Sequence, residues 1–115
     1  MDSQHIRTAV IEGFDNAPPL DTGAPIALQF AVTLGAVTAD AWLELKGSVR
    51  LHDYAAYQTE QFVQTMEAGM RADGEMDARR LNETRYAFAA GLMGRIQQHT
   101  LAALGIVTRD PRTTH

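Results

Sequence analysis

The sequence predicts an α+β fold, in which a small antiparallel sheet from the N-terminal half packs against an antiparallel pair of helices from the C-terminal half. Two periodicities lead to this prediction. Large apolar residues alternate strictly with smaller or polar residues from Ile26 to Leu34, which is the period of a half-buried strand. Beyond Asp53 the apolar residues instead recur every three or four positions, which is the period of an amphipathic helix. An all-α fold is the alternative if residues 26–46 are helical.

A β-hairpin is the preferred interpretation of residues 26–45. A two-residue turn at Gly35-Ala36 brings only apolar residues opposite one another on one face of the hairpin. These pairs are Leu34–Val37, Val32–Ala39, Phe30–Ala41, Leu28–Leu43 and Ile26–Leu45. A helix would divide the five large residues of the first strand between two separated faces, which favours the strand. A short helix from Thr38 to Lys46 is the competing interpretation of the second strand.

The flanking segments complete the N-terminal half. Residues 6–14 are rich in β-branched side chains and are expected to form a strand. Residues 15–25 contain three of the four prolines and are expected to form a loop or linker. At the other end of the chain, residues 108–115 have no apolar side chain and are expected to form a C-terminal arm.

Two helices are expected in the C-terminal half, over residues 53–72 and 77–104. Gly74 lies in a short polar break and can end the first helix, and the shortness of the break makes the two helices an antiparallel pair. Asp77 is placed to cap the start of the second helix, and Gly105 is placed to end it. The core expected from these elements consists of Ile26, Leu28, Phe30, Val32, Leu34, Leu43, Leu45, Phe62, Met66, Leu81, Phe88, Leu92 and Ile96.

Composition limits the classes of function. The 115 residues suffice for a single domain, 1–115, with one modest core. The chain has no cysteine, which excludes disulfides, thiolate metal sites and a cysteine nucleophile. A net charge of −4 argues against binding to nucleic acid. The N-terminal residues do not resemble a signal peptide, and no uninterrupted apolar run reaches the length of a membrane span, so we expect a cytoplasmic or virion protein with no membrane partner.

The densest group of polar, titratable side chains is His52-Asp53-Tyr54. A histidine beside a carboxylate can act as a general base, because the carboxylate fixes the tautomer and raises the basicity of the ring. The structural interpretation is that Asp53 caps a helix and that Tyr54 and Tyr57 pack against the sheet or a partner chain. The second interpretation is favoured, because such a dipeptide has little specificity.

Arg85 and His99 lie on the apolar stripe of the last expected helix. They are either a buried pair that binds a ligand or handles a proton, or ordinary core residues with hydrogen-bond partners. In the second case Arg85 pairs with an acid of the preceding helix, such as Glu60 or Glu67. The spacing of the four histidines matches no metal motif, and no cofactor motif is present, so neither a metal nor a cofactor is expected.

Small residues mark a candidate interface on the last helix. Ala87, Gly91 and Gly94 lie on the side opposite the bulky stripe, where another backbone can approach closely. We expect this side to meet a second chain. Trp42, which projects from the outer face of the expected hairpin, is a further candidate interface residue.

The sequence therefore predicts a non-enzymatic interaction subunit that acts as a homo-oligomer, with other copies of itself as its partner. A component of a viral or phage particle is one setting for such a subunit, since neighbouring chains there hold extended arms. The alternative is a small enzyme or ligand-binding domain with a pocket between sheet and helices, which uses either His52, Asp53 and Tyr54 or Arg85 and His99.

Overall fold

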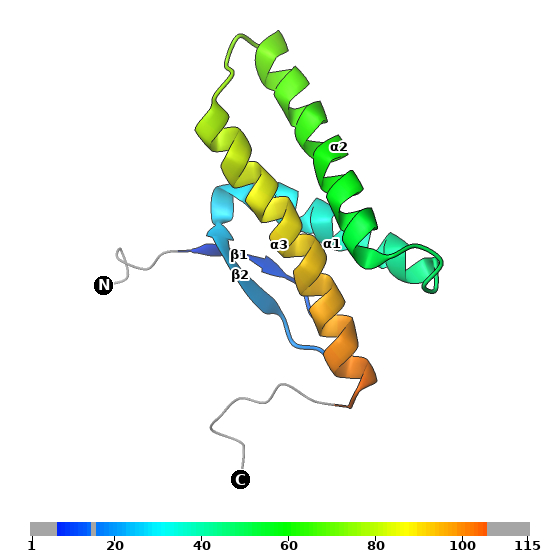
Figure 1. Ribbon diagram of the computed structural model, residues 1–115. Coiled ribbons are helices and arrows are strands. Elements are labelled where there is room, and N and C mark those ends of the chain that lie inside the picture. Colours follow the sequence, from blue (N-terminus) through cyan, green and yellow to red (C-terminus); the bar gives the residue numbers. More distant parts are fainter. Residues whose placement is uncertain (1–6, 15, 106–115) are drawn as a thin grey trace, which may run out of the picture.

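The computed structural model describes residues 7–14 and 16–105 and contains a two-stranded sheet and three long helices (Figure 1). The predicted α+β class is confirmed, with the sheet packed on helices. The predicted arm at residues 108–115 lies outside the described residues. The elements are β1 (Thr8–Ile11), β2 (Leu20–Pro25), a single 3-10 turn (η2, Ile26–Leu28), α1 (Gln29–Glu44), α2 (Leu51–Ala72) and α3 (Ala78–Ala103).

The hairpin predicted for residues 26–45 is wrong, because residues 29–44 form helix α1. The alternating pattern arises from a helix that is apolar on two faces. Leu28 and Val32 lie on the inner face and are buried with the small residues Ala31, Ala36 and Ala39. The other large residues of the pattern lie on the outer face and are exposed. The predicted core is therefore wrong at Ile26, Phe30, Leu34 and Leu45.

The sheet is formed earlier in the chain than predicted. The expected strand within residues 6–14 is confirmed as β1, and β2 takes up the second half of the segment 15–25 that was expected to be a linker. The two strands are antiparallel, and Ile11 pairs with Leu20. Leu20, Thr22 and Ala24 turn inward along β2 while Asp21 and Gly23 face outward, so a proline-rich segment still presents a largely apolar side to the helices.

Gln29 fixes this hairpin to the start of α1. Its side-chain Nε2 donates to the carbonyl oxygen of Val10, and its Oε1 accepts from the N–H of Val10, both at 2.9 Å. The amide of Gln29 therefore occupies the outer edge of β1 in the way that a neighbouring strand would.

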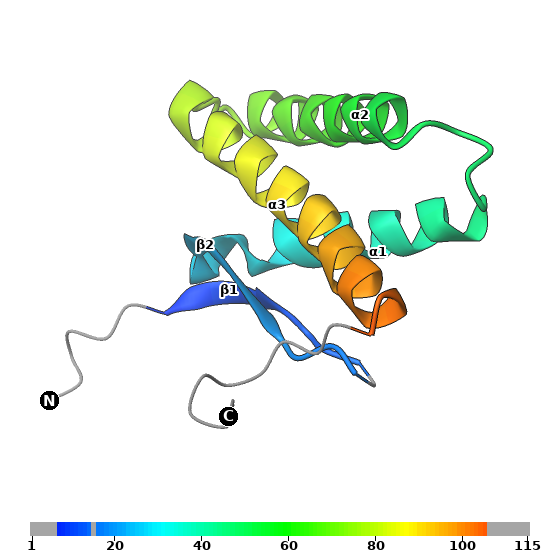
Figure 2. The ribbon, with the colours of Figure 1, turned by 60° about the horizontal axis from the view of Figure 1, so that its bottom comes forward.

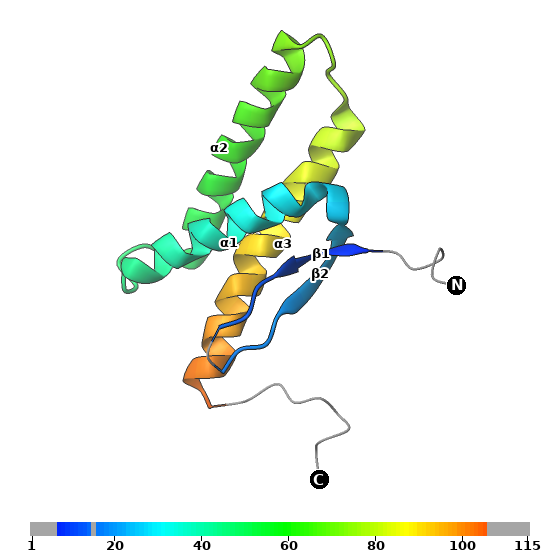
Figure 3. The ribbon, with the colours of Figure 1, turned by 180° about the vertical axis from the view of Figure 1, so that it is seen from behind.

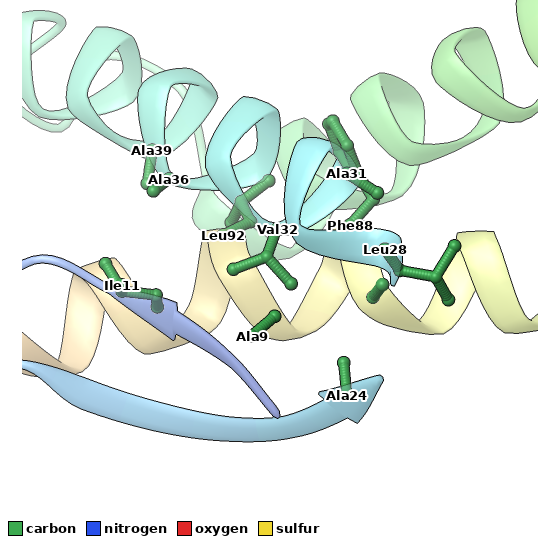
Figure 4. Packing of buried hydrophobic residues seen from close by; sticks show 11 residues of the cluster. Ala9, Ile11, Ala24, Leu28, Ala31, Val32, Ala36, Ala39, Phe88 and Leu92 are labelled. Carbon is green, nitrogen blue, oxygen red and sulfur yellow. The ribbon is translucent and has the colours of Figure 1, made fainter. Parts of the chain in front are cut away.

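Helices α1 and α3 cross at glycines. A Cβ added to Gly91 would overlap the carbonyl oxygen of Val32, and a Cβ added to Gly35 would overlap that of Phe88. Gly94 lies against the side chains of Ile11 and Leu20, which places the hairpin on the same side of α3. Figure 4 shows the resulting core, in which residues of α1, α3 and the hairpin meet.

Helix α2 packs on the other side of this core and runs antiparallel to α3, as predicted (Figures 1 and 2). The break between α2 and α3 has the glycine helix ending and the aspartate cap that the sequence predicts. Gly74 has φ +70° and its N–H donates to Arg71, while Glu75 N–H donates to Met70, which together form a Schellman ending. Asp77 then caps α3 by accepting from the N–H groups of two arginines, Arg79 and Arg80.

Few contacts hold α2. Phe62 stacks on Phe88 of α3 with ring centroids 4.5 Å apart, and Val63 is its one fully buried residue. Glu60 pairs with Arg85, as the structural interpretation of Arg85 predicted. Leu51 and Ala55 also pack against the core, so α2 is held along its N-terminal half and at its centre, while its C-terminal half is only partly covered.

The close helix crossing can be tested by comparing two glycine substitutions. Gly91→Ala should lower the free energy of unfolding by about 3 kcal/mol, because the added methyl group overpacks a backbone contact. Gly69→Ala, at a helical position with open space, should raise it by about 0.5–1 kcal/mol. Urea unfolding of both variants measures the difference, and a Gly91→Ala variant as stable as the wild type would contradict the crossing.

The hairpin also generates a pH prediction at Asp21. The Thr8 hydroxyl at 2.6 Å and, secondarily, the Gly23 N–H at 2.9 Å donate to this carboxylate and hold its pKa below the ordinary 3.8. Since the folded pKa is the lower one, this stabilisation is complete above pH 3.8 and is lost as the pH falls through the folded pKa. Thr8→Val should move the pKa of Asp21 back toward 3.8 in an NMR titration, whereas Thr65→Val, which is remote from Asp21, should leave it unchanged.

Candidate functional site

The outer face of α1 is the most prominent surface feature of the described residues. It consists of Ile26, Phe30, Leu34 and Val37, which are 42%, 43%, 46% and 56% exposed. At 100° per residue these four positions, together with the exposed Ala41, lie within one side of the helix. In Figure 3 α1 crosses in front of α3. Phe62 of α2 approaches one end of the outer face, where its ring lies 6.5 Å from that of Phe30.

No charged residue interrupts this part of the chain between residues 26 and 39. Ile26–Glu44 has a mean hydropathy of 1.5, so by length and composition alone it is apolar enough to cross a membrane. The core helices of soluble proteins meet the same criterion, and 33% of this window is already buried against the rest of the chain. A contiguous apolar face of this kind is typical of a surface that meets another molecule.

Trp42 and Tyr54, which were predicted as interface residues, hold α1 and α2 together. The indole Nε1 of Trp42 donates to the carbonyl oxygen of Val49 at 2.8 Å, in the loop between the helices. The hydroxyl of Tyr54 donates to the carbonyl oxygen of Thr38 at 3.0 Å. Both side chains are half-buried within the chain, whereas Tyr57 is exposed on α2.

Ala87, Gly91 and Gly94 are buried within the chain itself. The close backbone approach that their small size predicts does occur, but the approaching backbone at Gly91 is that of α1 in the same chain. Side chains of the hairpin, those of Ile11 and Leu20, cover Gly94. These three residues are therefore enclosed and are not part of the exposed surface.

The group His52, Asp53 and Tyr54 does not converge on one point. His52 and Asp53 are exposed, and the nearest partner of Asp53 is the exposed Arg50 at 3.9 Å. Arg50 rather than Asp53 precedes the first residue of α2, so the expected cap is wrong, and Asp53 lies within the first turn. A general base poised over a pocket is not formed by these side chains.

Arg85 and His99 also lie apart. They are separated by 14 residues of α3, a rise of about 21 Å. His99 stacks on Phe14 with centroids 4.4 Å apart, and its Nε2 lies 3.5 Å from a carboxylate oxygen of Asp40. This cluster borders a shallow hollow of about 340 Å³.

Sequence reasoning missed the polar junction formed by Arg95 and Gln98. The guanidinium of Arg95 donates to the carbonyl oxygen of Glu12 at 3.0 Å and lies 3.1 Å from Asp40. The buried amide of Gln98 donates to the carbonyl oxygen of Pro18 at 2.9 Å. Both residues lie near the C-terminal end of the small-residue side of α3. In the sequence, only this position could have indicated the junction.

A groove of about 770 Å³ lies between the hairpin and α1. Its principal polar side chains are Gln29, Thr33, Glu12 and Arg95. Gln29 and Arg95 already bond the backbone of β1 and the segment after it, and Gln29 also donates to the Thr33 hydroxyl at 3.0 Å. Most polar groups of this groove are therefore engaged within the chain.

Among residues 7–14 and 16–105, no cluster of three or more His, Asp or Glu side chains is arranged to hold a metal ion. Comparisons with known proteins give no match to a family model, to a curated protein or to a solved structure.

Proposed function

We propose that this chain is a non-enzymatic interaction subunit that assembles with copies of itself through the outer face of α1. The observation that carries the proposal is the side of α1 formed by Ile26, Phe30, Leu34 and Val37, which is apolar and free of charge. Water contact with these side chains is unfavourable by roughly 25 cal/mol for each Å² of apolar surface. A partner that covers this side would recover that free energy.

A second copy is the occupant that fits this face best. In a two-fold dimer each residue meets itself or its neighbours, so a charged face would repel its own copy. The segment 26–39 carries no charge and therefore meets its copy without like-charge repulsion. An anionic membrane is a poorer partner, because the chain has a net charge of −4 and this face offers no basic side chain.

The alternative, an enzyme or ligand-binding domain, has less support. His52 and Asp53 are exposed, and Arg85 pairs with Glu60 rather than with His99. In the groove between hairpin and α1, Gln29 and Arg95 are bonded within the chain, so they are not directed at a ligand.

The viral-particle setting depends on extended arms. Since the arm at residues 108–115 is outside the described residues, the proposal is limited to self-association.

A charge placed on the outer face tests the proposal. The wild-type chain should sediment as a multiple of 12.6 kDa, and Leu34→Glu should weaken association at least about a hundredfold, because its carboxylate would be buried without a partner. Gln97→Glu, which adds the same charge at an exposed position of α3, should leave association unchanged. Analytical ultracentrifugation over a range of concentrations measures all three.

Two results would overturn the proposal. One is a wild-type chain that remains at 12.6 kDa up to about 100 μM, and the other is a Leu34→Glu variant that associates as strongly as the wild type. A monomeric wild type that co-sediments with lipid vesicles, and loses this binding in Leu34→Glu, would assign the same face to a membrane instead.

A further inference from the structure

A third hollow, the α2–α3 groove, lies between α2 and α3 and reaches Phe30 of α1. It has a volume of about 400 Å³ and lies beside the break that joins the two helices. Its lining residues are Phe30, Thr65, Met66, Gly69, Met70, Asp73, Glu75, Asp77, Arg80 and Thr84. Met66 and Met70 are half-buried and form, with Phe30 of α1, an apolar wall that faces the hollow.

Gly69 leaves open space in the wall of this groove. Glycine weakens a helix, and Gly35, Gly91 and Gly94 are each explained by a neighbour that leaves no room for a Cβ. Gly69 lies in α2, yet a Cβ there would meet nothing within 4 Å. The space above Gly69 therefore serves no contact among the described residues, and it lies in the wall of the groove.

The charges around the groove define its occupant. Three carboxylates, of Asp73, Glu75 and Asp77, and one guanidinium, of Arg80, surround the apolar wall. A matching segment combines large apolar side chains with basic ones. Residues 106–112 of this chain, with the sequence IVTRDPR, have this combination and a net positive charge: Ile106 and Val107 come first, and Arg109 and Arg112 outnumber Asp110.

We propose that residues 106–112 of a second copy occupy the α2–α3 groove, with Ile106 and Val107 against Met66 and Met70 and the arginines at the acidic rim. This inference rests on the self-association proposed above. The methionines suit the role, because their flexible, polarisable side chains adapt to an incoming segment.

The length of α3 requires the segment to come from another copy. The groove lies at the N-terminal end of α3, while residues 106–112 follow its C-terminal end. The 26 residues of α3 rise about 39 Å between these ends. Val107 lies only a few residues beyond the helix, a reach of about 7–14 Å, so it cannot contact Met70 of its own chain. A copy that runs in the opposite direction places its own segment at this end.

Disulfide cross-linking tests the proposal cleanly, because the full chain has no cysteine. An isotope-labelled Val107→Cys variant is mixed with Met70→Cys and, separately, with Ala68→Cys, which is exposed on α2 outside the groove. Mass spectrometry of the mixed covalent dimer should show at least tenfold faster formation with Met70→Cys. Adding Gly69→Phe, which fills the groove, should reduce that rate toward the Ala68→Cys value.

A charge reversal gives an independent readout. Arg109→Glu with Arg112→Glu should slow the Met70 cross-link about tenfold, and Asp73→Lys with Glu75→Lys on the other chain should restore it. Equal rates for Met70→Cys and Ala68→Cys in a wild-type dimer of confirmed mass would overturn this inference and leave the proposed function intact. A chain that stays at 12.6 kDa would overturn both, and a cross-link within a single double-cysteine chain would overturn the assignment to a second copy.

Discussion

The backbones of α1 and α3 touch where Gly91 faces Val32 and Gly35 faces Phe88, and the rest of the fold depends on this contact. Helices normally pack with their axes 8–10 Å apart because side chains lie between them. Here the absence of a Cβ on each side lets the helices approach more closely, and Ala31, Ala36 and Ala39 extend the narrow seam. The hairpin then fits against the same side of α3, where Gly94 leaves space for Ile11 and Leu20.

This narrow seam determines where the bulk of α1 lies. An inner face made largely of alanine, glycine and valine buries little area for each residue, and the larger side chains of the helix fall on the other side. Helix α2 covers little of that side, because its contact is centred on Phe62 and Val63. The small residues that allow α1 to cross α3 closely therefore leave the large apolar side chains of α1 on its outer face.

The sequence predicts the two C-terminal helices and the break between them, but it does not predict α1, which is apolar on two faces. The helices at 51–72 and 78–103, the glycine ending at Gly74 and the Asp77 cap follow from local chemistry that acts within a few residues. The segment 26–44 misleads because strict alternation indicates a strand only when one face is buried. The small side of α3 is recognisable from spacing, but whether Gly91 meets α1 or another chain depends on tertiary packing. The Arg95–Gln98 junction could not be predicted because most of its partners are backbone carbonyls 80 or more residues away in the sequence.

The amide of Gln29 has a consequence for how the chain behaves in solution. A two-stranded sheet has open edges, and an open edge is a template on which further strands can add without limit. Gln29 satisfies both backbone groups of Val10 at the outer edge of β1, and Arg95 and Gln98 occupy the carbonyl oxygen of Glu12 further along. Strand addition at this edge would have to displace three side chains. Growth of the sheet by strand pairing at the β1 edge is thus obstructed, and this edge is protected against the addition that leads to fibres.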